Sequence, residues 1–98
     1  MDRVERLQDA INRLHGCEAK HLHSTPVMET FQGRIVWDGD VELFALTGHP
    51  KAQLCYAWIE DRGHGDERYF AVLGTPPINS AKEAVRAMIV SEFRNRRT

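Results

Sequence analysis

The sequence has 98 residues, of which 42% are hydrophobic and 28% are charged, a composition typical of one globular domain over residues 1–98. Its formal net charge of -1 lacks the basic excess of most proteins that grip nucleic-acid phosphates, which argues against nucleic acid as the main partner. No apolar run reaches the length of a signal peptide core or a membrane span, so we predict a cytoplasmic protein without membrane contact.

Residues 2–14 predict a helix, because apolar side chains recur there at intervals of three and four. Asp2 is placed to cap its first turn, and Gly16 is placed to end it. A narrow apolar stripe suits packing on a sheet or pairing with a second copy of the helix, and the pattern agrees with both. The stripe consists of Val4, Leu7, Ile11 and Leu14.

Two extended segments follow, at residues 20–31 and 34–46, with a tight turn at Gln32-Gly33 between them. Pro26 has no amide donor, which predicts an edge position for the first strand. The segment 38–40, Asp-Gly-Asp, interrupts the second strand. It predicts either a hairpin turn or a bulge that bends one long strand, and we favour the bulge.

Residues 52–60 form the predicted central strand. Its side chains are apolar on both sides of the two-residue period: Leu54, Tyr56 and Trp58 alternate with Cys55, Ala57 and Ile59. A strand without a polar face is expected to be covered above and below. A polar loop with glycines then leads to a last strand at residues 67–73, which also has two apolar faces.

Ser80 and Glu83 form a capping-box pattern, which predicts a second helix from residue 81 to about residue 96. The chain order predicts an α+β fold made of a helix, a three- to four-stranded antiparallel meander and a helix, with both helices on one face of the sheet. The opposite face would then expose apolar side chains to water. The inward side of the second helix is expected to comprise Ala84, Val85, Met88, Ile89 and Phe93.

The order helix, strands, helix is similar to that of double-stranded-RNA-binding domains, whose second helix begins with a lysine-rich phosphate clamp. The matching segment here, residues 79–84, has a single lysine, Lys82, followed by Glu83, so the resemblance implies the topology and not the RNA-binding function. The motifs ETFQG, VWDG, LTGHP and YAW, between Glu29 and Trp58, resemble short bacterial proteins of unassigned function, some of which travel as integron gene cassettes. That resemblance implies no activity.

Histidines and a cysteine gather near the start of the first strand. On a regular strand, His21 and His23 would project to the same side, as metal-binding pairs do, and Cys17 could supply a third ligand. The spacing matches no standard structural zinc pattern, so we predict solvated histidines on an edge strand rather than a metal site. Cys17 and Cys55 are too few for a disulfide scaffold and are expected to be free thiols.

Two further groups of residues are candidates for chemistry. The loop from Glu60 to Glu67 is rich in carboxylates but lacks the pattern of a calcium loop, which favours a solvated turn. His49 and Cys55 could act as a base and a nucleophile, but no third group orients them. We therefore predict no catalytic residue and no cofactor.

Aromatic side chains are the strongest indication of function, since tryptophan and tyrosine concentrate at interfaces and in ligand clefts. Some of them must form core beneath the helices whatever else they do. The predicted binding residues are Trp37, Phe44, Tyr56, Trp58 and His49.

These residues support three hypotheses about function. The first is a non-catalytic binding or interaction domain that forms a homodimer through the apolar, aromatic face of the sheet. The second is a small-molecule-binding sensor or enzyme with an aromatic-lined cavity, in which His49 or His64 transfers a proton. Nucleic-acid binding ranks third.

Overall fold

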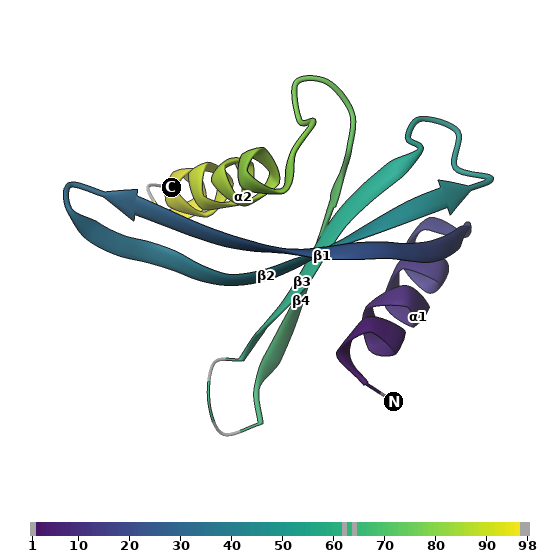
Figure 1. The fold of residues 1–98 in the computed structure, drawn as a ribbon, viewed down its shortest axis with the longest axis horizontal. Coiled ribbons are helices and arrows are strands. Elements are labelled where there is room, and N and C mark those ends of the chain that lie inside the picture. Colours follow the sequence, from purple (N-terminus) through teal and green to yellow (C-terminus); the bar gives the residue numbers. More distant parts are fainter. Residues whose placement is uncertain (1, 62, 64, 97–98) are drawn as a thin grey trace.

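The protein folds into a four-stranded antiparallel sheet with two helices (Figure 1). The computed structural model describes residues 2–61, 63 and 65–96. The sheet has the strand order β1-β2-β3-β4, so the predicted α+β class and the order helix, antiparallel meander, helix are confirmed. The elements are α1 (Arg3–His15), β1 (Glu18–Phe31), β2 (Arg34–Thr47), β3 (Leu54–Asp61), β4 (Glu67–Leu73) and α2 (Ala81–Arg96). Over the part of the chain described, neither helix combines the length and apolar composition needed to cross a membrane.

Helix α1 begins and ends where its capping residues predict. The Glu5 amide donates to the Asp2 carboxylate at 2.8 Å, and this hydrogen bond holds the pKa of Asp2 below its usual value. Gly16 takes the left-handed conformation, with φ of 60°, and its amide donates to the Asn12 carbonyl at 3.0 Å. The predicted apolar stripe is shorter than expected, because Leu14 in the last turn is 73% exposed.

Strands β1 and β2 form one long hairpin. Gln32 and Gly33 both have positive φ, 53° and 78°, as a two-residue hairpin turn requires, which confirms the predicted turn. β2 continues unbroken through residues 38–40, and Gly39 pairs with Val27 there, so one long strand is confirmed but the bulge is not at this place. The register shifts instead between Glu29 and Thr30, where Val36 is the extra residue on β2, and between His21 and His23.

The two helices pack on opposite faces of the sheet, which corrects the prediction that both share one face. Successive side chains of a strand point to opposite faces, and β3 divides accordingly. Cys55 and Ala57 belong to a core with α1, whereas Tyr56 and Trp58 belong to a core with α2. Figure 1 shows α1 and α2 on opposite sides of β3 and β4.

Each core has its own set of residues. We call the first set the α1-face core: Leu7, Ile11, Ala19, Phe44, Leu46, Ala52, Cys55 and Ala57. We call the second set the α2-face core: Val27, Val41, Tyr56, Trp58, Phe70, Ala84 and Val85. Helix α2 of the same chain therefore covers the face with Tyr56 and Trp58, which the sequence predicted to be open. The dimer was predicted because this face would need a cover, and that argument no longer applies.

The far part of the β1–β2 hairpin extends past the rest of the sheet. The last pair between β2 and β3 is Glu42 with Ala57, so residues 25–41, which we call the arm, are paired only with each other. Figure 1 shows the arm running alongside α2. An ion pair joins the arm to α2, with Arg86 Nε 2.6 Å from Glu29 Oε1. The geometry of this contact is not that of a hydrogen bond. The Glu29 side chain is 7% exposed.

Candidate ligand-binding pocket

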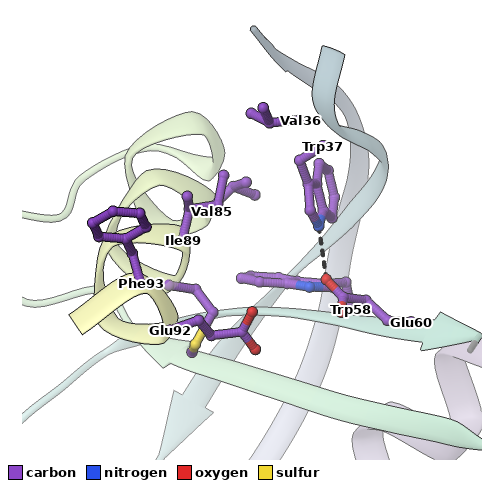
Figure 2. Close-up of a pocket in the computed structure, with 9 residues that line it drawn as sticks. Val36, Trp37, Trp58, Glu60, Val85, Ile89, Glu92 and Phe93 are labelled. Atoms are coloured by element: carbon purple, nitrogen blue, oxygen red, sulfur yellow. Dashed lines mark hydrogen bonds between the residues drawn. The ribbon is translucent and has the colours of Figure 1, made fainter. Parts of the chain in front are cut away.

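A pocket of about 320 Å³ lies between the arm, β3 and residues 85–93 of α2 (Figure 2). We call it the α2 pocket. Its volume is at the lower end of the range of small-molecule sites, roughly 300–1,000 Å³. The residues that line it come from three elements that are far apart in the sequence: Val36, Trp37, Trp58, Glu60, Val85, Met88, Ile89, Glu92 and Phe93.

Two tryptophans form adjoining walls of the α2 pocket. Trp58 is 1% exposed and stacks on Phe70, with the ring centroids 5.4 Å apart and the planes 12° apart. Trp37 meets Trp58 edge to face, with the centroids 5.6 Å apart and the planes at 75°. Figure 2 shows Trp37 standing above the flat ring of Trp58, with the side chains of α2 on the third side.

Gly39 allows Trp37 to take this position. A Cβ atom at residue 39 would lie 3.1 Å from Trp37 Cη2, closer than ordinary van der Waals contact. Trp37 and Gly39 are two residues apart on β2, so both face α2, and the indole covers the bare glycine backbone. The short Asp-Gly-Asp segment therefore shapes the pocket wall, a role that its turn-like composition does not indicate.

Two carboxylates give the α2 pocket its polar groups. The Trp37 indole donates to Glu60 Oε1 at 2.9 Å, which fixes the position of this carboxylate at the foot of the tryptophan (Figure 2). Glu92 accepts from Arg68 at 3.3 Å. The indole nitrogen of Trp58 is buried and has no acceptor among the described residues, which is uncommon for a buried donor.

The structure brings together only part of the predicted binding set. Trp37 and Trp58 both line the α2 pocket. Phe44 is fully buried in the α1-face core, on the other side of the sheet, where its ring meets His21. Tyr56 is buried in the α2-face core, and burial, followed by the nearby Glu83 carboxylate, raises its pKa.

His49 lies apart from the tryptophans, in the loop between β2 and β3. Its Nδ1 accepts the amides of Lys51 at 3.0 Å and Ala52 at 3.1 Å, so the side chain holds the loop in shape. Its ring packs edge to face against His15, with the centroids 5.4 Å apart. A second hollow of about 630 Å³ lies beside it, but residues of one hairpin alone form its wall and it opens widely to solvent.

The histidines considered for metal binding point away from each other. The register shift in β1 pairs His21 with Phe44 and His23 with Leu43, which are consecutive residues of β2, so the two histidines lie on opposite faces of the sheet. His21 hydrogen-bonds Glu42 at 2.8 Å, whereas Cys17 packs against the α1-face core. Within the described residues no three metal-ligating side chains gather at one point.

The described residues of the carboxylate-rich loop after β3 make local hydrogen bonds typical of a turn. The Gly63 amide donates to the Asp61 carboxylate at 2.8 Å, and the Asp66 amide donates to the Gly63 carbonyl at 3.0 Å. Glu67 pairs with Arg6 of α1 at 2.6 Å. His64, predicted as a proton-transfer residue, lies outside the described residues.

Cys55 is held as a neutral thiol. Burial, and then the nearby Cys17, raises the pKa of Cys55 from 9.0 to about 12. Its sulfur lies 3.9 Å from the Tyr56 carbonyl, and His49 bonds the loop amides instead. His49 and Cys55 therefore do not form a base and nucleophile pair in the structure.

The raised pKa of Cys55 predicts its reactivity and its effect on stability. At pH 8, dithionitrobenzoate should react with one thiol of the folded protein, Cys17, and with two after unfolding, and Cys17→Ser should abolish the first reaction. Because the folded pKa is above the unfolded one, the contribution of Cys55 to stability is complete below pH 9 and is lost as the pH rises toward 12. Two thiols reacting before unfolding would contradict this assignment.

Sequence reasoning missed the other walls of the α2 pocket. Met88 and Ile89 face inward as predicted and pack against the α2-face core, and they also line the pocket. Phe93, also predicted to face inward, is 62% exposed and lines the pocket. Glu60 was assigned to a solvated turn, although it sits two residues after Trp58 on the same face of β3. The two-residue spacing between Trp58 and Glu60 is the signal that could have identified Glu60 as a pocket residue.

Comparison with known proteins leaves the α2 pocket to be interpreted from its own chemistry. Neither a protein-family model, nor a curated protein sequence, nor a solved structure matches this chain.

Proposed function

We propose that this protein is a non-catalytic binding domain that holds a small organic molecule in the α2 pocket. The observation that carries the proposal is the pair of tryptophans, from β2 and β3, that meet at 75° to wall a pocket of about 320 Å³ with a carboxylate fixed at its edge. Ligand sites in proteins are concave and mostly apolar, with a few placed polar groups, and the α2 pocket has this composition.

The lining favours binding over catalysis. Its nine residues include no serine, threonine, cysteine, histidine or lysine, so among the residues that the structure describes neither a nucleophile nor a histidine base faces the pocket. Its polar groups are the Glu60 and Glu92 carboxylates, which are hydrogen-bonded to Trp37 and Arg68. Such groups orient a ligand and select its charge.

A thermal-shift screen of small metabolites, repeated on two matched variants, tests the proposal. Val36→Trp places a bulky ring at the edge of the α2 pocket, where Val36 is 48% exposed and the fold can accept it. Ile35→Trp makes the same kind of change at the neighbouring residue, which is 61% exposed and does not line the pocket. We expect a compound that stabilises the native protein and the Ile35→Trp variant but not the Val36→Trp variant.

Two results would refute this function. One is a screen in which no compound raises the melting temperature of the native protein. The other is equal stabilisation of the Val36→Trp variant, because the compound would then bind elsewhere. The homodimer remains a separate prediction, which sedimentation tests as a mass near twice 11.2 kDa, and a pocket built by one chain does not depend on it.

A further inference from the structure

Building on the proposed function, we infer that the ligand of the α2 pocket is a small organic cation, such as an ammonium group with alkyl substituents. An indole face attracts a positive charge within about 6 Å of the ring centroid, and tryptophan does so more strongly than tyrosine or phenylalanine. The inference depends on two independent features of the pocket, the two tryptophans in its wall and the sign of the charge around them.

The tryptophan faces form a corner that fits an alkylated cation. Trp58 stacks on Phe70 on one side, with the ring centroids 5.4 Å apart, and is only 1% exposed where it lines the pocket, so the half-buried Trp37 provides most of the indole surface that a ligand can contact. Trp37 stands on the other side at 75°, so the two indoles are adjoining walls, and Val85 and Ile89 of α2 form the third (Figure 2). Alkyl groups on the cation would contact these apolar walls while its charge faces the rings.

The charged groups around the pocket favour a positive ligand. The described residues that line the pocket include two carboxylates and no basic side chain. Arg68 on β4 is opposite Glu60 in the register, but its guanidinium bonds Glu92 and lies 5.0 Å from the centroid of the Phe70 ring. Glu60 is held by a neutral donor, the Trp37 indole, and has no cationic partner among the described residues.

A ligand of another charge would fit this arrangement less well. An anion would face Glu60 and the negative sides of two indole rings, which repel it. A neutral apolar compound would fill the corner and leave the Glu60 carboxylate without a counter-charge. A cation satisfies the carboxylate and the indole rings together.

Tryptophan fluorescence titrations with matched probes test the inference, since both tryptophans of the chain line the pocket. The probes are choline, benzyltrimethylammonium and 3,3-dimethylbutan-1-ol, which is the neutral counterpart of choline in shape. We expect both ammonium compounds to bind with dissociation constants at least about tenfold lower than that of the alcohol. Added salt should weaken the binding of the ammonium compounds and leave that of the alcohol unchanged.

Variants at two glutamates separate local charge from net charge. Glu60→Gln keeps an acceptor oxygen for the Trp37 indole and removes the charge, so choline affinity should fall roughly tenfold while alcohol affinity stays constant. Glu18→Gln makes the same change of net charge at an exposed position on β1 that does not line the pocket, and it should alter neither affinity. An unchanged choline affinity in the Glu60→Gln variant would overturn the inference.

The outcomes distinguish the inference from the function on which it rests. If the alcohol binds as tightly as choline, or if neither ammonium compound binds while a screened compound is still blocked by Val36→Trp, the pocket is a ligand site and the cation is wrong. If no compound at all is blocked by Val36→Trp, the proposed function fails as well.

Discussion

Replacing Trp58 with alanine is expected to lower the free energy of unfolding by about 3–5 kcal/mol, the range for loss of a large aromatic side chain from a core. Trp58 is 1% exposed and contacts Phe70 on one side and Trp37 on the other. Its removal leaves a cavity in the α2-face core and takes away one wall of the α2 pocket. Urea unfolding followed by circular dichroism measures the loss.

Trp58→Phe provides the matched control. A phenyl ring keeps the stack on Phe70, so the loss should be clearly smaller than for alanine. If Trp58 were instead an exposed contact for a second subunit, both variants would change stability by less than about 0.5 kcal/mol, as surface substitutions usually do. That result would contradict the burial of Trp58 beneath α2.

Leu7→Ala in α1 and Val85→Ala in α2 should destabilise the protein additively. Leu7→Ala removes a fully buried side chain and should cost about 2–5 kcal/mol, and Val85→Ala, with fewer atoms lost, should cost less. Because the two residues belong to cores on opposite faces of the sheet, their effects should add within about 0.5 kcal/mol. Urea unfolding of both single variants and the double variant gives the coupling energy.

A pair within one core serves as the positive control. Leu7→Ala combined with Ile11→Ala acts twice on the α1-face core, and residues in contact couple by roughly 0.5–3 kcal/mol. If the first double variant is too unstable to measure, Ile11→Val, at about 0.5–1.5 kcal/mol, replaces Leu7→Ala. A coupling of the same size between Leu7 and Val85 would mean that the helices share one core, in contradiction to the structure.

The elements of the fold could be predicted from local chemistry, because their ends depend on nearby residues. Asp2 and Gly16 bound α1, Gln32 and Gly33 form the hairpin turn, and Ser80 accepts the amide at the start of α2. These signals act over three or four residues, so periodicity and capping rules identify them.

The placement of the helices could not be predicted in the same way. β3 has apolar residues on both faces, which correctly predicts that both faces are buried. The periodicity of β3 does not indicate which helix packs on which face. The answer depends on how the loops before β1 and after β4 turn. In the structure the small side chains Cys55 and Ala57 face α1, and the large Tyr56 and Trp58 face α2.

The sequence identified only part of the candidate site. Trp37 and Trp58 were chosen for their residue type, and the structure brings them into contact. Glu60 becomes part of the site only because the arm lies over α2 and lets the Trp37 indole reach it. The extra residue between His21 and His23 had the opposite effect, since one inserted position places the second histidine on the other face.

The two tryptophan indoles provide the most direct test of a ligand in the α2 pocket, because each gives one resolved N–H signal in a two-dimensional ¹H–¹⁵N NMR spectrum and the chain has no other tryptophan. During a titration with benzyltrimethylammonium, we predict that both indole signals move along one saturation curve. The amide signals of Leu7 and Ile11, which belong to α1 on the opposite face of the sheet, should not move. Indole signals that remain fixed while signals from residues 45–54 move would place the binding beside His49 and contradict the α2 pocket.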